Sequence, residues 1–341
     1  MNKPKLNEEQ IYKKAYGTLL GVAVGDALGM PSSMMSPEAI KETFKEKITS
    51  FLPAPEGHVI HFGMKAGEIT DDTQQTMILA DIFLEEGKFT KESVAKRLLA
   101  WAKKMNGFNN TMLGPSSIRS LKRIEDGVPI EKAGTLGDTN GAVMRISPAG
   151  IVNPGDYDAV LKNVHEVCIP THNTNIAIAG AASVACAISA GMAGKRIEEI
   201  IEAYFYGAEK GMSLGNQWYG ASIIHRTKWA LEIAQAGKSE EEFWTDLYNY
   251  IGAGVAISEA TPTALALFVY YKGNPMKTII GATNMGGDCD TIGAIAGSIA
   301  GAYAGHDIFP QQIIDKIEEV NRLNLKSYAK RFAEKICDKK S

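Results

Sequence analysis

Near its beginning the chain reads Gly17-Thr18-Leu19-Leu20-Gly21-Val22-Ala23-Val24-Gly25-Asp26-Ala27-Leu28-Gly29, with a glycine at every fourth position. Residues four apart lie on the same side of an α-helix, so these glycines line one face of a predicted helix. An interior glycine costs a helix about 1 kcal/mol, and the close approach of a second backbone offsets that cost. We therefore expect this face to pack directly against another helix.

The same spacing recurs late in the chain, where the glycines are Gly293, Gly297, Gly301 and Gly305. In membranes such spacing marks helix dimer faces, but the apolar stretch 292–304 is too short to cross a bilayer, which takes about 20 residues. Two helices in tight contact inside a soluble core explain both sets. Such a contact would bring Asp26 towards Asp288.

Two acidic runs, Thr70-Asp71-Asp72-Thr73 and Asp288-Cys289-Asp290-Thr291, each open an apolar stretch with helical spacing. Helix capping explains either run alone, because Thr and Asp are favoured N-caps and first-turn carboxylates gain about 0.3–1 kcal/mol each. A cap needs only one acceptor, however, and clustered carboxylates repel one another unless a cation offsets them. Carboxylate and hydroxyl oxygens suit magnesium, manganese and calcium. The two runs together therefore predict one metal site.

Apolar positions recur mostly at helical spacing, and stretches with a period of two are scarce, so the predicted fold class is all-α. The 341 residues contain no linker long enough to divide domains. We expect a single domain over residues 1–341, with its core at about 10–335. The predicted helices cover residues 8–28, 72–86, 91–104, 116–125, 156–166, 174–193, 196–210, 217–235, 240–255, 260–271, 291–304 and 310–334.

The bulk composition argues against several protein classes. A formal net charge of −3, with scattered Lys and Arg, gives no basic field for nucleic acid. Residues 1–14 are polar and charged rather than a secretory leader, and the cysteines form neither a CxxC pair nor a zinc spacing. We therefore expect a reducing, cytoplasmic location. The cysteines are Cys168, Cys186, Cys289 and Cys337.

One segment, residues 175–194, carries no charge and is about long enough to cross a bilayer. It consists mainly of Ala, Gly and Ser, whereas a spanning helix is normally built from Leu, Ile, Phe and Val. A helix buried on all sides inside a large α-helical domain explains this composition better. We therefore predict no membrane partner.

Three further features admit both a structural and a ligand-binding interpretation. The glycine-rich turn 137–141 can present N–H groups to a phosphate, with Arg145 nearby, although it matches neither a P-loop nor a dinucleotide motif. A simple turn and a structural partnership of Arg145 with an aspartate are the alternatives. His172 can donate to an anion at a helix N-terminus or be purely structural. Trp218 and Tyr219 can stack on a purine or pack against the protein.

Together these motifs resemble, in order and in separation, those of the ADP-ribosylglycohydrolase family over about residues 10–305. The resemblance implies an all-α single-domain fold with two magnesium or manganese ions in a cleft. It also implies hydrolysis of bonds at the anomeric carbon of ribose, including those of ADP-ribosylated arginine or serine. The motifs that carry it are 25–29, 69–74, 140–145 with Pro148, 171–172 and 287–291.

The same resemblance implies roles for individual residues. Asp290 would bridge the two ions, and an aspartate of the cluster (Asp71, Asp72 or Asp288) would act as general base for a water activated by the cations. Phosphate and ribose contacts fall on Asn140, Gly141 and His172. The implied metal ligands are Thr70, Asp71, Asp72, Asp288, Asp290 and Thr291.

Two departures from the family pattern affect the expected substrate. Many members carry a glutamate a few residues after the 25–29 motif, where it reaches the metal centre, and this chain has Ser33 there. A serine cannot act as an acid or base near neutral pH. Met34 and Met35 beside it predict a more apolar rim. Relatives often have a glycine-rich loop around the pyrophosphate at 106–114, which this chain lacks.

These observations lead to one functional hypothesis and two alternatives. The leading substrate is ADP-ribosylated protein or a related ADP-ribose conjugate. The first alternative is hydrolysis of a nucleoside or another small N-riboside on the same scaffold. The second is a non-catalytic member, crystallin-like or ligand-binding, although loss of catalysis would relax the need to hold like charges together.

Overall fold

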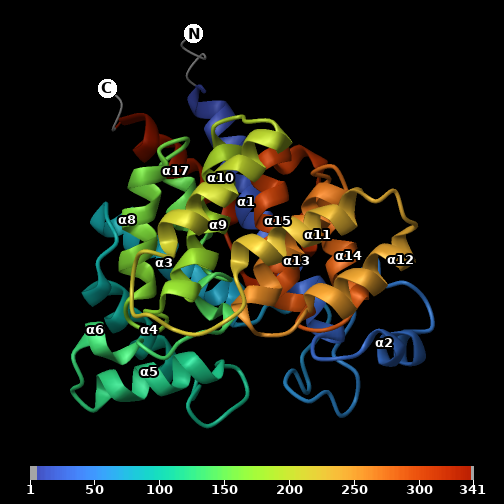
Figure 1. The fold of residues 1–341 in the computed structure, drawn as a ribbon, viewed down its shortest axis with the longest axis horizontal. Helices are drawn as coiled ribbons and strands as arrows, with labels where there is room; N and C mark the ends of the chain where they lie inside the picture. Colours follow the sequence, from blue (N-terminus) through green and yellow to red (C-terminus); the bar gives the residue numbers. More distant parts are fainter. Residues whose placement is uncertain (1–5, 339–341) are drawn as a thin grey trace.

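The computed structural model of the protein describes residues 6–338, and every regular element in that range is helical (Figure 1). The predicted all-α class is therefore confirmed. The longer helices are α1 (Glu8–Gly29), α3 (Asp71–Glu86), α4 (Lys91–Lys104), α5 (Pro115–Glu125), α8 (Tyr157–Cys168), α9 (Asn175–Met192), α10 (Ile197–Gly211), α11 (Ile223–Gln235), α13 (Ile257–Tyr270), α14 (Pro275–Met285), α15 (Cys289–Ala304), α16 (Gln311–Asn321) and α17 (Leu325–Asp338). The short ones are α2 (Pro37–Phe44), α6 (Ile130–Ala133), α7 (Ser147–Ile151) and α12 (Glu240–Asp246).

Three predicted helices were wrong in extent. Predicted helix 217–235 begins only at Ile223, where Ser222 provides the N-cap. Predicted helix 240–255 ends earlier, because α12 passes into a π turn (Leu247–Ile251) that stops at Gly252, whose φ is 91°. The prediction 310–334 is two helices, α16 and α17, because Arg322 adopts a left-handed conformation with φ 52°. The other predicted boundaries lie within three residues of the observed ones, while α2, α6, α7 and α14 were not predicted.

The predicted contact between the two glycine faces is confirmed, because α1 and α15 lie side by side at the centre of the molecule (Figure 1). A methyl carbon added at Gly21 would lie 2.0 Å from the carbonyl oxygen of Gly297. One added at Gly25 would lie 2.1 Å from the carbonyl oxygen of Gly293. No side chain larger than hydrogen fits between these backbones, so the two helices are held at close range.

Helix α9 is the uncharged segment singled out from the sequence. Its length and composition would allow it to cross a membrane, but all of its 18 residues are buried inside the protein. It packs against α7, α8, α10 and α15. Around it, one hydrophobic cluster includes residues from Ile11 in α1 to Ile336 in α17. Helix α9 is thus a core helix, as its small residues predicted.

Substitution at the glycine face should destabilise the fold. In Gly21→Ala the added methyl group overlaps the carbonyl oxygen of Gly297, and relief requires the helices to separate. We expect the free energy of unfolding to fall by about 3 kcal/mol, the upper range for overpacking. Urea denaturation measures this change. Gly114→Ala is the control, because φ there is −64° and no atom lies within 4 Å of the added carbon; equal stability of both variants would contradict the packing argument.

Candidate active site

Both acidic runs open onto one cavity of about 270 Å³. Asp71 and Asp72 enter it from the N-terminus of α3, while Asp288, Asp290 and Thr291 enter it from the N-terminus of α15. The polar part of the wall also includes Asn140 and Gly141, two of the predicted substrate contacts. The remaining wall is largely apolar and includes Met34, Ile60, Met112, Leu113, Met144 and Val255.

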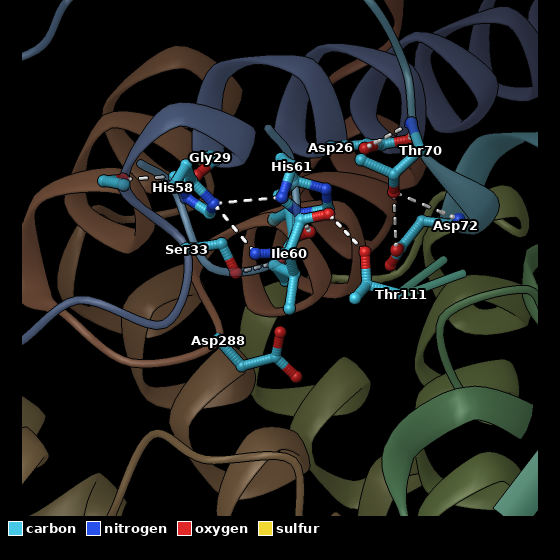
Figure 2. A network of polar contacts seen from close by, with 12 residues as sticks. Asp26, Gly29, Ser33, His58, Ile60, His61, Thr70, Asp72, Thr111 and Asp288 are labelled. Atoms are coloured by element: carbon cyan, nitrogen blue, oxygen red, sulfur yellow. Dashed lines mark hydrogen bonds and ion pairs between the residues drawn. The ribbon is translucent and has the colours of Figure 1, made fainter. Parts of the chain in front are cut away.

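The first run is anchored from below by Asp26 of α1. The Asp26 carboxylate accepts the backbone N–H of Thr70 at 3.0 Å and that of Thr73 at 3.1 Å, and it accepts the Thr73 hydroxyl at 2.5 Å. The Thr70 side chain does not line the cavity; it caps α3 and donates to Asp72 Oδ2 at 3.0 Å (Figure 2). The hydrogen bonds of Asp26 go to the first run, and burial, helped by the charge of Asp290 in the second run, raises the pKa of Asp26. The expected approach of Asp26 to Asp288 itself stays a prediction.

The second run is placed by a two-glycine turn that precedes α15. Both Gly286 and Gly287 have φ of 91°, and a methyl carbon at Gly287 would lie 2.2 Å from the carbonyl oxygen of Ala253. The Gly287 N–H donates to the Met35 carbonyl at 2.9 Å, and the Asp288 N–H donates to the Ala253 carbonyl at 2.7 Å. Glycine is needed here both for the left-handed conformation and for the close backbone.

Asn140 connects the glycine-rich turn 137–141, the central loop, to the second acidic run, residues 288–291. Its side-chain amide donates to Asp288 Oδ2 at 2.6 Å, and its backbone N–H donates to the Val255 carbonyl at 2.9 Å. Gly141 beside it packs tightly, because an added methyl carbon would lie 3.1 Å from the His172 ring, which would have to shift by a few tenths of an ångström. The predicted residues Asn140 and Gly141 therefore reach the cavity directly.

His172 does not line the cavity, in contrast to the other predicted substrate contacts. Its side chain is fully buried, with Nε2 3.1 Å from the Thr139 hydroxyl and Nδ1 2.8 Å from the Thr171 hydroxyl. His172 supports the loop of Asn140 through its hydrogen bond with Thr139, and it is not among the residues of the cavity wall. A contact role for His172 stays a prediction.

Arg145 is likewise buried and does not present a charge to a phosphate. Its guanidinium donates to Gln75 Oε1 and to Thr171 Oγ1, both at 2.6 Å. Gln75 in turn donates to Asp71 Oδ2 at 2.8 Å. Arg145 therefore belongs to a hydrogen-bonded chain that runs from Asp71 to the support of the Asn140 loop. The structural interpretation of Arg145 holds, with Gln75 between it and the aspartate.

The aromatic pair Trp218 and Tyr219 lies outside the cavity wall. Trp218 Nε1 donates to Asp138 Oδ2 at 3.2 Å, and the two rings are 5.0 Å apart. The Tyr219 side chain is exposed. Trp218 thus fastens the loop that precedes α11 to the central loop. For Trp218 this is packing against the protein, the alternative to stacking on a purine.

His61 belongs to the site but was not among the residues predicted from the sequence. Its Nε2 lies 2.7 Å from Asp290 Oδ2, and the Ser33 hydroxyl donates to Asp290 Oδ1 at 2.6 Å. Both side chains of the His61–Asp290 pair are nearly inaccessible, with 8% and 5% exposed. The available signal was a pair of histidines, His58 and His61, in the loop before the first acidic run, but no spacing rule connects that loop to α15.

Comparison with known proteins identifies the family of this chain. The profile of the ADP-ribosylglycohydrolase family matches residues 7–341. The chain belongs to the ADP-ribosylglycohydrolase family. It is 34% identical to the Escherichia coli (strain K12) protein YegU, over 94% of this chain and 96% of that one. It is 25% identical to the ADP-ribosylarginine hydrolase Tri1 of Pseudomonas putida (strain GB-1), over 92% of this chain and 76% of the relative.

A solved structure, described as an ADP-ribosylglycohydrolase-related protein complex, has the same fold as this chain. The TM-score is 0.68 at 23% identity, with 96% of this chain and 98% of that one covered. Family membership makes the protein a hydrolase and supports hydrolysis of ADP-ribose glycosidic bonds.

The carboxyl groups that line the cavity destabilise one another's ionised form. Burial, followed by the Asp290 carboxylate, raises the pKa of Asp71 to about 8. Burial also raises the pKa values of Asp72 and Asp288 well above the usual range. Burial would raise the pKa of Asp290 too, but the hydrogen bond and the charge of His61, together with hydrogen bonds from Ser33 and Asp288, outweigh burial and hold that pKa below its usual range.

The donor set suits hard divalent cations. Asp72 Oδ1 is buried and has no hydrogen-bond partner, which is costly for a carboxylate oxygen unless a cation lies beside it. Within residues 6–338, no three His, Cys, Asp or Glu side chains form a ready-made ligand group. Any cation held here would need the hydroxyl of Thr291, water molecules and small side-chain rotations to complete its coordination.

His61 and His172, two of the three buried histidines in the described residues, should have pKa values shifted in opposite directions. Burial alone lowers the pKa of His61, but the Asp290 carboxylate outweighs it, so the pKa lies above 6.5. Burial, followed by Arg145, lowers the pKa of His172 well below 6.5. NMR titration of the metal-free protein should find the His61 ring protonated and the His172 ring neutral at pH 6.5.

Asp290→Asn is the matched variant for this titration. It removes the carboxylate and leaves the burial, so the pKa of His61 should fall below 6.5. Because the pKa of His61 is raised on folding, its pairing stabilises the protein fully below pH 6.5 and loses that effect as the pH rises through the folded pKa. A His61 pKa that Asp290→Asn leaves unchanged would contradict the pairing.

Proposed function

We propose that this protein is a divalent-cation-dependent hydrolase that cleaves the bond between the anomeric carbon of a ribose and its leaving group. The observation that carries the proposal is the convergence of Asp71, Asp72, Asp288 and Asp290 on one cavity from two distant helix N-termini. Without a positive partner, four buried carboxylates repel one another. Two magnesium or manganese ions would neutralise them.

The chain's own residues divide the work of this reaction. The four aspartates and the hydroxyl of Thr291, which line the cavity, would hold the cations. Thr70, whose hydroxyl donates to Asp72, would orient that ligand. Such cations, when bound, lower the pKa of water and orient ribose hydroxyls. An aspartate of the cluster (Asp71, Asp72 or Asp288) takes the proton from the attacking water as its oxygen bonds to the anomeric carbon. The leaving group departs with the bond's electron pair and receives the proton that the aspartate took from the water, directly or by exchange through a second water molecule.

ADP-ribosylated protein or a related ADP-ribose conjugate is the first substrate class. It is supported by the family and by the Pseudomonas relative, whose name gives ADP-ribosylarginine as the substrate of that protein. Asn140 and Gly141 lie on the cavity wall beside the carboxylates, where the ribosyl part of such a substrate would bind. The cytoplasmic location expected from the sequence is compatible with a protein substrate.

A nucleoside or other small N-riboside is the second candidate, and the composition of the wall favours it. Among the residues that line the cavity there is no lysine or arginine. A diphosphate would meet neutral N–H and hydroxyl donors and His61, which is already paired with Asp290. Met34, one of the two methionines of the predicted apolar rim, lines the cavity, whereas Met35 does not, and Met112, which was not predicted, lines it too. A non-catalytic role is disfavoured because the full set of aspartates is present.

Removal of single carboxylates should abolish metal binding and hydrolysis together. Asp72→Asn and Asp290→Asn each remove one charge from the cluster without changing its size, so Mn²⁺ affinity should fall at least about 100-fold. Electron paramagnetic resonance of free Mn²⁺ measures it. Asp126→Asn, an exposed position at the end of α5, is the control. Wild-type affinity in both cavity variants would refute the ligand assignment.

The substrate class is decided by one assay with the metal-loaded protein. ADP-ribosyl-arginine peptide, ADP-ribosyl-serine peptide and a panel of nucleosides are each incubated with Mg²⁺ or Mn²⁺, and mass spectrometry detects the released sugar. We expect ADP-ribose from at least one peptide. Release of free base from nucleosides alone would select the second candidate, and no release from any compound would contradict the proposed reaction.

A further inference from the structure

We propose that His61 is a positioning residue of the metal centre, which fixes the Asp290 carboxylate in the orientation needed to hold a cation. The proposal rests on the proposed function for the presence of a cation. It adds a histidine, from a loop, to a site otherwise built from two helix N-termini. Four observations carry it. His61 contacts one oxygen of Asp290, Ser33 holds the other oxygen, a braced turn presents the His61 ring, and His61 lines the same cavity as the aspartates.

The contact joins an imidazole nitrogen to a carboxylate oxygen in a buried setting. His61 Nε2 and Asp290 Oδ2 are 2.7 Å apart, a short distance typical of charge-assisted hydrogen bonds. No other basic side chain in the described part of the chain pairs with Asp290. The bond therefore decides how this carboxylate is turned.

The second oxygen of Asp290 is held as well. The Ser33 hydroxyl donates to Oδ1 at 2.6 Å, so both oxygens accept one hydrogen bond from the protein. An ionised carboxylate has about four lone-pair sites, so two donors leave room for cations on both oxygens. Held from both sides, the plane of this carboxylate cannot rotate freely, and Asp290 is itself part of the cavity wall.

His61 is presented by a tight turn rather than by a helix. His58 Nδ1 accepts the backbone N–H of His61 at 3.0 Å and that of Ile60 at 3.3 Å, as Figure 2 shows. The Ile60 carbonyl accepts the Thr111 hydroxyl at 2.7 Å, which ties the turn to the loop before α5. A turn braced in this way directs the His61 ring at Asp290 without help from the helices.

The physical consequence is a preorganised ligand. Donors that bond to a metal-ligating carboxylate fix its orientation, and their loss typically weakens metal binding 10–100-fold. A histidine that merely closed the cavity wall would contribute to stability and leave metal affinity alone. The two roles are therefore separated by the affinity of the full-length protein for Mn²⁺, measured apart from activity.

The experiment compares His61→Ala, His61→Gln and His225→Ala by isothermal titration with Mn²⁺, with thermal unfolding measured in parallel. We expect His61→Ala to raise the Mn²⁺ dissociation constant about 10–100-fold. His61→Gln should recover a substantial part of the loss, because its amide N–H can donate to Asp290. His225, an exposed residue of α11, is the matched histidine control and should leave the constant unchanged.

Each outcome decides something. Wild-type affinity in a folded His61→Ala protein overturns the proposal, as does equal loss in His61→Ala and His61→Gln. If His61→Ala does not fold, Ser33→Ala, which frees the other Asp290 oxygen, must weaken Mn²⁺ binding; unchanged binding there overturns the positioning argument. Absence of Mn²⁺ binding by the wild-type protein instead refutes the metal centre of the proposed function, and this inference falls with it.

Discussion

The backbone contact between α1 and α15 is the constraint on which the rest of the molecule depends. Glycine faces such as those of Gly21 and Gly297 let the two helices approach closely at the centre of the core. Asp26 on α1 then binds the backbone of the first acidic run, while α15 itself begins with the second run. A core built from larger residues would separate α1 from α15, and with them the carboxylates of the cavity.

Bringing the carboxylates together creates a charge problem that the surrounding side chains only partly relieve. Asn140 and Gln75 each donate to one aspartate, and His61 supplies the one basic side chain in contact with the cluster within the described residues. Asp72 keeps an oxygen without a partner. The surrounding side chains therefore fix the positions of the carboxylates more than they stabilise their negative charge. The proposed cation site requires such an arrangement.

Much of this could be predicted from the sequence because it rests on local periodicity. The glycine spacing predicted the α1–α15 contact, and caps such as Thr70 marked the acidic helix starts. Breaks set by a single backbone conformation were missed, as at Arg322, because a left-handed arginine carries no compositional signal. His61 was missed for a related reason: its role depends on where a loop folds. For His172 the sequence left open a contact with an anion or a structural role. Its burial beside Thr139 and Gly141 depends on tertiary packing, which no local pattern reveals.

The central claim is that two acidic runs far apart in the sequence form one dinuclear cation site, and crystals grown with Mn²⁺ test it directly. Diffraction data collected at the manganese absorption edge locate the ions without reference to activity. The account predicts strong anomalous peaks inside the cavity, within coordination distance of Asp72 and of Asp290. Peaks elsewhere on the protein, with the cavity lacking any, would contradict it.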